Sequence, residues 1–346
     1  MKSASWPRAN PLEERLLVIT PAAKQGRYID AQIKDLGDIL RAGDLLIVND
    51  AATLPASLVA GDIELRLVGH EADGSWRAVL FGKGDWRTPT EQRLPPRRLR
   101  VGDHLVIASA FHAVVEEVAH ASPRLVRVRF TLSEAEVLAA FYRYGHMIQY
   151  SYLTRELNNW STQTSYSSRP WAVEMPSAGR PLSAGLLLAL RRKGMELASL
   201  THAAGISSTG LDSLDRLLPL RERFDIPQRT VDAIAAARAR GGRIIAVGTS
   251  VVRALEGCAE NHQGRLVAGV GETELIIGGK IHSQPNRLPI ADGLLSGMHE
   301  ATESHYQLLQ AFAPAPVLAE SIRMANELGY VMHEFGDSCL IISRGE

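Results

Sequence analysis

The sequence predicts the α/β class, with an α/β domain formed by both ends of the chain and a small β-barrel domain inserted into it. Between 61 and 137, short apolar alternations are separated by Gly, Asp and Pro, as in strands joined by turns. From Leu186 onward, helical and extended patterns alternate, which is typical of α/β organisation. We therefore predict an α/β domain at 1–60 and 149–346 and a barrel domain at 61–148.

The individual elements follow from hydrophobic periodicity. Strands of the barrel are predicted at Ile63–Val68, Trp76–Phe81, His104–Ala108 and Leu125–Phe130. Leu45–Asn49 is an unbroken apolar run, so we expect a buried strand of the α/β sheet, which makes the barrel an insertion. The α/β part is predicted to contain helices at Leu186–Lys193, Arg229–Arg240, Val251–Ala259 and Glu303–Phe312, and strands at Leu197–Thr201, Ile244–Gly248 and Cys339–Ser343.

Composition indicates a cytoplasmic enzyme. The 346 residues can bury a large core, and this length favours two domains. Lys plus Arg (38) equals Asp plus Glu (38), so no global field attracts nucleic acid, and tRNA binding would need a local patch. The two cysteines form no disulfide framework, which suits a reducing compartment. No apolar run reaches the roughly 18 residues of a membrane span, so no membrane association is expected.

The most informative segment runs from Arg243 to Glu260, where an apolar run ends in Gly-Thr-Ser and an amphipathic pattern begins. This pattern predicts a strand, a tight turn and a helix. The first N–H groups of a helix have no partner within it and carry partial positive charge, so they can bind a carboxylate or a phosphate. Thr249, Ser250 and Arg253 would add donors. The alternative is an ordinary capped corner between a strand and a helix.

This segment carries a resemblance to a known family. Its core, AVGTSVVRALE at Ala246–Glu256, resembles the AVGT-T-S-V-R-x-L-E signature of the S-adenosylmethionine:tRNA ribosyltransferase-isomerases of queuosine biosynthesis. Further segments are similar to family motifs in the same order: LRAGDLLIVND at Leu40–Asp50, YGH at Tyr144–His146, TQT at Thr162–Thr164, AVEMPSAGRPL at Ala172–Leu182 and GYVMHEFGDSCLII at Gly329–Ile342. The resemblance implies the same fold, an α/β domain with an inserted barrel.

Other motifs depart from the family pattern. The family's P-L-P-P-Y-I run is MIQYSYL at Met147–Leu153, and its G-L-H-F is GRPL, which introduces Arg180. Single motif residues survive at His202, Glu222 and His299. These departures indicate a divergent paralogue of the family.

The resemblance implies a reaction. A sulfonium acidifies the adjoining ribose C5′–H of S-adenosylmethionine, the substrate. A general base can then begin a rearrangement that expels adenine and methionine and transfers the ribosyl carbons to an amine. In the family, the amine belongs to a 7-aminomethyl-7-deazaguanine in tRNA.

Site residues are predicted at the carboxyl ends of strands, where α/β sheets bind ligands. His299 is the candidate general base, since imidazole titrates near neutral pH, and Glu334 or Asp337 would orient it or lie near the sulfonium. The turn before Arg253 would hold the methionine carboxylate or a phosphate. The full set of predicted substrate-binding residues is Asn49, Asp50, Ser177, Ala178, Gly179, His202, Glu222, Thr249, Ser250, Arg253 and Glu300.

His-Glu dipeptides occur at His299 and His333, and imidazole and carboxylate are common metal ligands. His305 lies six residues beyond His299, whereas a zinc helix of the HExxH type places its two His four apart. We therefore expect no metal.

Three functions remain open from the sequence. The protein performs the queuosine step on tRNA; or it uses S-adenosylmethionine or a related small-molecule nucleoside with a different acceptor; or it is a non-catalytic module that binds RNA or nucleotide. Arg180 and the polar block from His299 to His305 favour the second, since a decayed site would lose polar residues.

Overall fold

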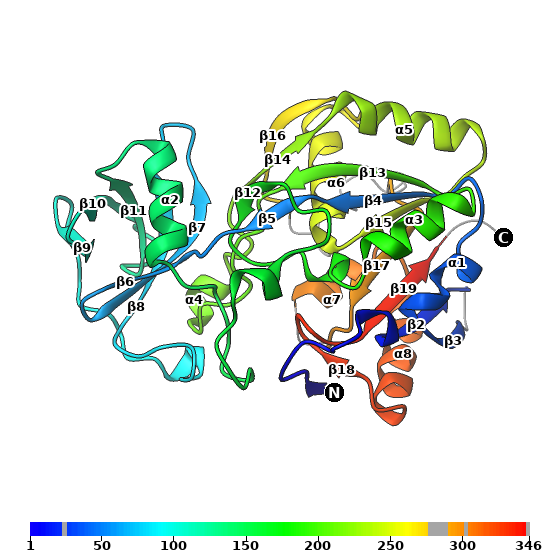
Figure 1. The fold of residues 1–346 in the computed structure, drawn as a ribbon, viewed down its shortest axis with the longest axis horizontal. Coiled ribbons are helices and arrows are strands. Elements are labelled where there is room, and N and C mark those ends of the chain that lie inside the picture. The colour runs from blue at the N-terminus through cyan, green and yellow to red at the C-terminus, as the bar shows by residue number, and fades with distance from the viewer. Residues whose placement is uncertain (23–25, 276–289, 301–303, 344–346) are drawn as a thin grey trace.

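The computed structural model describes residues 1–22, 26–275, 290–300 and 304–343 (Figure 1). Strands of this part of the chain form two large sheets, one of nine strands and one of six. The six-stranded sheet lies at one end of the molecule, and the strand pair that leads to it and away from it, β5 (Ala51–Thr53) and β12 (Arg169–Ala172), runs parallel. The α/β class with a barrel-like sheet is confirmed.

The nine-stranded sheet has four parallel strands at its centre. These are β13 (Glu196–His202), β4 (Leu45–Asn49), β15 (Ile244–Val247) and β17 (Gly293–Gly297), in that order. Both flanks contain antiparallel pairs, formed by β14 (Glu222–Ile226) and β16 (Gly269–Thr273) on one side and by β19 (Ser338–Ile342), β2 (Arg15–Thr20) and β3 (Arg27–Gln32) on the other. The parallel centre is buried on both faces, as parallel sheets require.

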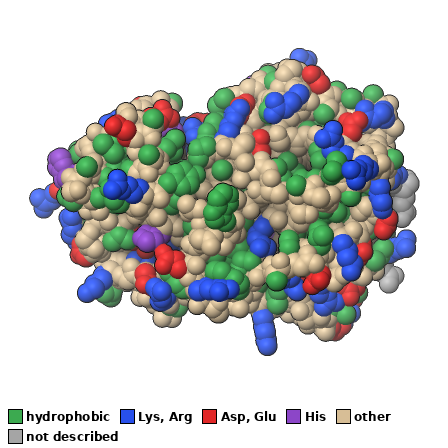
Figure 2. All heavy atoms as spheres, in the orientation of Figure 1, with side chains coloured by type: hydrophobic (Ala, Val, Ile, Leu, Met, Phe, Trp, Pro, Cys, Tyr) green, Lys and Arg blue, Asp and Glu red, His purple; other side chains and the backbone are tan. Residues whose placement is uncertain are grey.

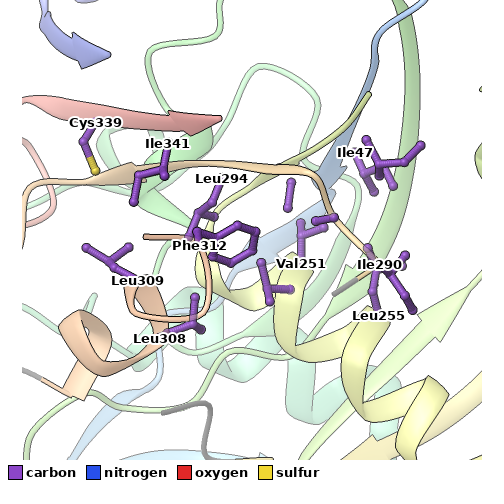
Figure 3. Packing of buried hydrophobic residues seen from close by; sticks show 14 of the residues in the cluster. Ile47, Val251, Leu255, Ile290, Leu294, Leu308, Leu309, Phe312, Cys339 and Ile341 are labelled. Carbon is purple, nitrogen blue, oxygen red and sulfur yellow. The ribbon is translucent and has the colours of Figure 1, made fainter. Parts of the chain in front are cut away.

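Alternate residues of the central strands enter two separate cores. Leu45 and Ile47 pack with helices α5 (Gln228–Ala239), α6 (Thr249–Asn261), α7 (Ser304–Leu309) and α8 (Ala315–Glu327). Figure 3 shows Ile47 near Val251 and Leu255 of α6 in this core. Leu46 and Val48 face the opposite way and pack with α1 (Leu36–Ile39) and α3 (Ala184–Arg192). Because side chains alternate between faces along a strand, one apolar run serves both layers.

The six-stranded antiparallel sheet has the order β6-β7-β8-β11-β10-β9 and nearly closes, because its edge strands β6 and β9 contact each other. The six strands are β6 (Ser57–Ala60), β7 (Ile63–His70), β8 (Trp76–Phe81), β9 (His104–Ala108), β10 (Phe111–Val118) and β11 (Leu125–Phe130). Helix α2 (Glu134–Tyr144) packs against this sheet through Phe141, whose ring meets Trp76 edge-on at 5.1 Å. This aromatic cluster fills the barrel-like core.

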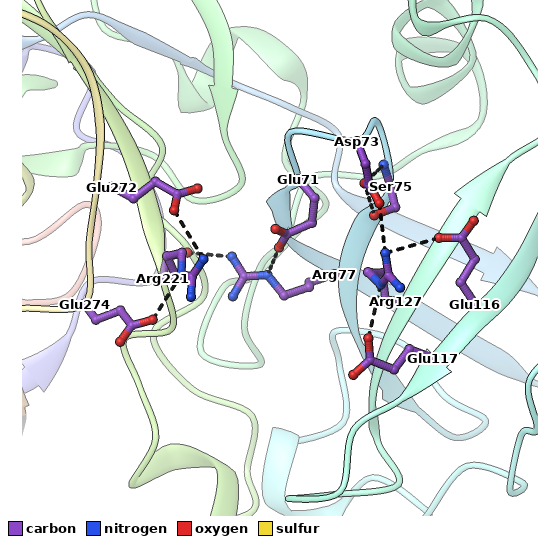
Figure 4. Close-up of polar contacts among 10 residues, drawn as sticks. All are labelled: Glu71, Asp73, Ser75, Arg77, Glu116, Glu117, Arg127, Arg221, Glu272 and Glu274. Carbon is purple, nitrogen blue, oxygen red and sulfur yellow. Dashed lines mark hydrogen bonds and ion pairs between the residues drawn. The ribbon is translucent and has the colours of Figure 1, made fainter.

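A polar contact joins the two sheets at the surface. Arg77 of β8 donates a hydrogen bond to the carbonyl oxygen of Arg221, just before β14, at 2.8 Å (Figure 4). Arg221 in turn pairs with Glu272 at 3.3 Å and Glu274 at 3.1 Å. Exposed ion pairs of this kind contribute little to the free energy of unfolding, so we assign this contact no large share of the stability.

The expected strands at Trp76–Phe81, His104–Ala108 and Leu125–Phe130 have the same bounds in the structure. Helix α2, strand β17 and helix α8 were not predicted. Helix α7 begins at Ser304, and the start predicted at Glu303 lies outside the described residues. The predicted domain boundaries stay a prediction, although Val173, Ile206 and Leu214, all beyond residue 148, pack into the core of the barrel. Within the described ranges, no helix is long and apolar enough to cross a bilayer.

Candidate functional site

Predicted site residues follow all four central strands at one edge of the nine-stranded sheet. Asn49 ends β4, His202 ends β13, Thr249 follows β15, and His299 follows β17. Because the four strands are parallel neighbours, their carboxyl ends place these residues along a single edge. Ligands of open α/β sheets bind at such an edge.

The side chain of Asn49 ties three of these strand ends together. Its Oδ1 accepts a hydrogen bond from the backbone N–H of His202 at 2.9 Å, and its Nδ2 donates to the carbonyl oxygen of His202 at 3.0 Å. The same Nδ2 lies 3.2 Å from Oγ of Ser250, at the start of α6. Asn49 is almost fully buried, so these bonds fix the spacing of the edge.

Next to Asn49 lies a buried charged network. Glu222 Oε2 is 2.8 Å from an Arg253 Nη1 and 3.1 Å from Nε2 of His202, and its Oε1 accepts from the backbone N–H of Gly205 at 2.7 Å. Burial alone would raise the pKa of Glu222, but the charges of Arg253 and His202 and the Gly205 bond lower it to about 2. Near neutral pH, an ionised Glu222 therefore neutralises Arg253.

This pairing bears on the anion site expected at Arg253. The structure gives Arg253 a protein partner, Glu222, and leaves its Nε and Nη2 buried without a hydrogen-bond partner among the described residues. A role for Arg253 in holding a substrate anion stays a prediction. The turn itself has the predicted form, because Gly248 adopts a φ of 92° and α6 begins at Thr249. The first N–H groups of α6 thus remain the basis of that expectation.

The segment Ser177–Gly179, a 3-10 helix labelled η5, lies beside this turn. A Cβ built on Gly248 would lie 3.5 Å from the Cβ of Ala178, and η5 contacts β17. The structure therefore brings Ser177, Ala178 and Gly179 together with the start of α6 and with the strand that leads to His299.

Tyr166 packs against the candidate site at Gly179, and sequence reasoning did not single it out. A Cβ on Gly179 would overlap the Tyr166 hydroxyl, so only glycine fits against that ring. Burial raises the pKa of Tyr166, and the charge of Asp50 raises it further. Asp50 accepts hydrogen bonds from Thr201 at 2.6 Å and Ser199 at 3.1 Å. Tyr166 lies two residues after the matched Thr162–Thr164 motif, and this proximity is the signal that could have identified it.

His299 is half-buried, with Nε2 3.2 Å from Oγ of Ser296 on β17. Glu300 pairs with the amino group of Met1 at 2.5 Å. Residues 301–303 and the side chain of His305 lie outside the part of the chain that the structure describes, and so does most of the polar block predicted there.

Asp337 and Glu334 have partners of their own. The buried Asp337 carboxylate accepts from Arg8 at 2.5 Å and from the backbone N–H groups of Arg15 at 3.0 Å and Val331 at 2.8 Å. Its carbonyl oxygen accepts from Met298 N at 2.9 Å, which brings Asp337 beside the His299 segment. These bonds favour a structural role for the Asp337 side chain, and its expected role in orienting His299 stays a prediction.

Glu334 accepts a hydrogen bond from Tyr152, which belongs to a stack of aromatic rings that the sequence did not predict. The ring of Tyr152 lies 6.0 Å from that of Tyr150 and 4.4 Å from that of His333, nearly parallel to both. Tyr152 donates its hydroxyl hydrogen to Glu334, and Tyr150 donates to Glu174. Burial raises the pKa of Glu174 to about 7, helped by the nearby charge of Glu334.

Part of the stack comes from a segment that departs from the family pattern. Both tyrosines belong to MIQYSYL, the segment that replaces P-L-P-P-Y-I. His333 adopts a φ of 72°, which is uncommon for a non-glycine residue and is found at functional sites. In the sequence, the signal that could have indicated this stack is the pair Tyr150 and Tyr152, two positions apart, together with the dipeptide His333-Glu334.

Comparison with known protein families identifies the chain. The model of a family described as queuosine biosynthesis protein matches residues 2–341. The chain belongs to this family. An S-adenosylmethionine:tRNA ribosyltransferase-isomerase of Sorangium cellulosum is 34% identical, covering 96% of this chain and 94% of that protein. The enzyme of the same name from Thermus thermophilus is 30% identical, covering 91% and 89%.

The fold comparison agrees. The crystal structure of an S-adenosylmethionine tRNA ribosyltransferase from Thermotoga maritima matches with a TM-score of 0.52 and 23% identity, covering 98% of this chain and 96% of that one. The resemblance stated from the motifs is therefore confirmed, and the chain is an enzyme of a family that uses S-adenosylmethionine. The two alternative functions, a different acceptor and a non-catalytic module, are not favoured.

Proposed function

We propose that this protein is an S-adenosylmethionine:tRNA ribosyltransferase-isomerase of queuosine biosynthesis. One observation carries the proposal: in a member of this family, η5, the Gly248–Ser250 turn and the His299 segment meet at the carboxyl edge of four parallel strands. The departures at MIQYSYL and GRPL leave this arrangement in place. The acceptor is then the amine of 7-aminomethyl-7-deazaguanine in tRNA.

His299 is proposed as the general base that removes the C5′–H proton. It is half-buried, with Nε2 3.2 Å from Oγ of Ser296, and an imidazole can take up a proton near neutral pH. Glu174, which accepts a hydrogen bond from Tyr150 and whose pKa burial raises to about 7, is the alternative base. The first N–H groups of α6 would bind the methionine carboxylate.

The overall reaction balances as follows. The C5′–H proton and one proton of the acceptor amine are removed. The electron pair of the amine forms the new C–N bond, and the pair left at C5′ forms a new carbon–carbon bond within the transferred five-carbon unit. The bond from ribose to adenine breaks, and adenine takes up one proton. The C–S bond breaks with its electron pair on sulfur, so the sulfonium becomes the neutral thioether of methionine. One proton is released in total, and no redox partner is needed.

The direct test supplies S-adenosylmethionine together with tRNA that contains 7-aminomethyl-7-deazaguanine and follows adenine by chromatography. We expect adenine release that requires the tRNA. Adenine release with a small amine but not with the tRNA would contradict the assignment and favour a different acceptor.

The remaining expectations follow from this function. A cytoplasmic location, which was predicted from composition, is the location proposed for an activity on tRNA. The expectation of no metal stays a prediction.

A further inference from the structure

A cavity of about 380 Å³ lies between the barrel-like sheet and the nine-stranded sheet, outside the strand-edge site. The barrel side contributes residues of β7, β8, β11 and α2, and the other side contributes β12 and β14. The residues that carry the argument are His70, Trp76, Glu134, Trp171 and Arg223. A cavity of this size suits a small ligand such as one nucleotide.

Arg223 is a partly buried cation that senses the charge of Glu134, another lining residue, but forms no ion pair with it among the described contacts. Its guanidinium lies over the ring of Trp171 at 3.8 Å, and its Nη1 donates to Nδ1 of His70 at 3.3 Å. Among the described residues Arg223 makes no ion pair, and its buried Nε has no hydrogen-bond partner. Burial lowers the pKa of Arg223, as expected for a cation removed from water. A partly buried cation is stabilised by direct contact with an anion, and Arg223, which lacks such a contact among the described residues, could make one with an anionic ligand.

Flat aromatic surfaces line the same cavity. Trp171 contributes an indole beside Arg223, and on the opposite wall the rings of His70 and Trp76 lie 4.7 Å apart. Glu134, at the start of α2, is exposed and lines the cavity, where it can accept hydrogen bonds from N–H groups of a base. Aromatic and guanidinium planes that stack bases, with polar groups for base edges, are the means by which proteins hold unstacked nucleotides of RNA.

The cavity is connected to the strand-edge site through two strands. On β14, Glu222 is buried in the charged network with His202, while the next residue, Arg223, points to the other face and lines the cavity. Trp171 is on β12, which pairs with β5 directly after Asp50. A nucleotide in the cavity would therefore lie one strand away from the site of chemistry.

We propose that this cavity binds one unstacked nucleotide of the tRNA, a neighbour of the base being modified, with its base stacked on Trp171 and its phosphate at Arg223. The inference rests on the proposed function. The cavity would also give the protein a local site for RNA, which a net charge of zero does not provide. Lys and Arg are scattered over the face seen in Figure 2 and form no single basic patch there.

The test measures the affinity for an RNA hairpin with the sequence of the tRNA anticodon arm, by fluorescence anisotropy at several salt concentrations. Arg223→Gln is expected to bind roughly tenfold more weakly and to lower the slope of log affinity against log salt by about 0.7, the loss of one phosphate contact on a single strand. Trp171→Ala is expected to bind roughly tenfold more weakly with the slope unchanged, because stacking does not depend on salt.

Two controls separate the explanations. Arg323→Gln changes an exposed Arg of α8 that pairs with Glu320 and Glu327, away from the cavity, and should leave both quantities unchanged. The dissociation constant for S-adenosylmethionine shows that each variant is folded, and it should equal that of the wild type.

Each outcome decides a specific point. Folded Arg223→Gln and Trp171→Ala variants with wild-type RNA affinity and slope, in a protein that modifies tRNA, would overturn the cavity assignment alone. Tight binding of free GMP that is lost in Arg223→Gln, with RNA binding unaffected, would overturn it in favour of a free nucleotide. A wild-type protein that binds S-adenosylmethionine but neither binds nor modifies the RNA would overturn the proposed function and the cavity assignment with it.

Discussion

The side-chain amide of Asn49 hydrogen-bonds to both backbone polar groups of His202, accepting from its N–H at 2.9 Å and donating to its C=O at 3.0 Å. Asn49 thereby links the carboxyl ends of β4 and β13, and its 3.2 Å contact with Ser250 extends the link to the start of α6. An amide is required for this, because a carboxylate can accept but cannot donate. The geometry of the predicted site depends on this buried residue.

Asn49→Asp should therefore destabilise the fold by about 3 kcal/mol, since the His202 carbonyl loses its donor and a charge is buried. The free energy of unfolding in urea measures this loss. Asn326→Ala removes an exposed amide that donates to Ile322 O, and it serves as the control with an expected change below about 0.5 kcal/mol. Equal stability of the two variants would contradict a special role for Asn49.

Glu222 predicts a pH dependence of stability. Its pKa in the folded protein, about 2, lies below the ordinary value of 4.5, so its contribution is fully present above pH 4.5 and is lost as the pH falls from 4.5 toward 2. Glu222→Gln leaves Arg253 buried without its partner and should cost about 3 kcal/mol at pH 7. The difference in unfolding free energy between wild type and variant should shrink across that window; a difference that stays constant with pH would show that Glu222 is not ionised as described.

Gly179 predicts a paired substitution. Gly179→Ala places a Cβ onto the Tyr166 hydroxyl and should destabilise the protein by about 2 kcal/mol through overpacking. Removing that hydroxyl in Tyr166→Phe should restore part of the loss, although the ring carbon Cζ would still lie 3.1 Å from the new Cβ. A double-mutant cycle of unfolding free energies measures the coupling. Additive effects would mean that the two residues do not meet.

The sequence predicted β4 with its correct bounds, because an unbroken apolar run of this short length favours a fully buried strand over a helix. Strand β17, GLLSG, was missed because its glycines and serine give it neither strong β-propensity nor alternation. Helix α2 was not predicted although Ser133 and Glu136 form a capping box. The region up to residue 137 was predicted to contain strands joined by turns.

For the site, the strand-end rule placed Asn49, His202 and Ser250 on one edge, and the structure joins them. The pairing of Glu222 with Arg253 could not be predicted, because it depends on the packing of β14 against α6, and such contacts leave no local pattern. The Tyr150–Tyr152–His333 stack likewise brings together segments far apart in the chain.

The choice between His299 and Glu174 as general base is a kinetic prediction. His299→Ala should lower kcat by about 10²- to 10⁴-fold and leave the dissociation constant for S-adenosylmethionine nearly unchanged, because the base acts in the transition state. In the wild type, kcat should rise with pH near neutrality as the general base loses its proton. Glu174→Gln should keep this rise if Glu174 is not the base. If Glu174→Gln abolishes that rise while His299→Ala preserves it, Glu174, with its pKa near 7, is the base instead.

The central claim is ribosyl transfer to tRNA, and mass spectrometry of the tRNA tests it most directly. The purified protein is incubated with S-adenosylmethionine and tRNA that carries 7-aminomethyl-7-deazaguanine. The mass of the modified nucleoside is then measured, and free adenine is quantified. We expect the nucleoside to gain the ribosyl carbons, with one adenine released for each nucleoside changed. An unchanged nucleoside, from a protein shown to bind S-adenosylmethionine, would contradict the account.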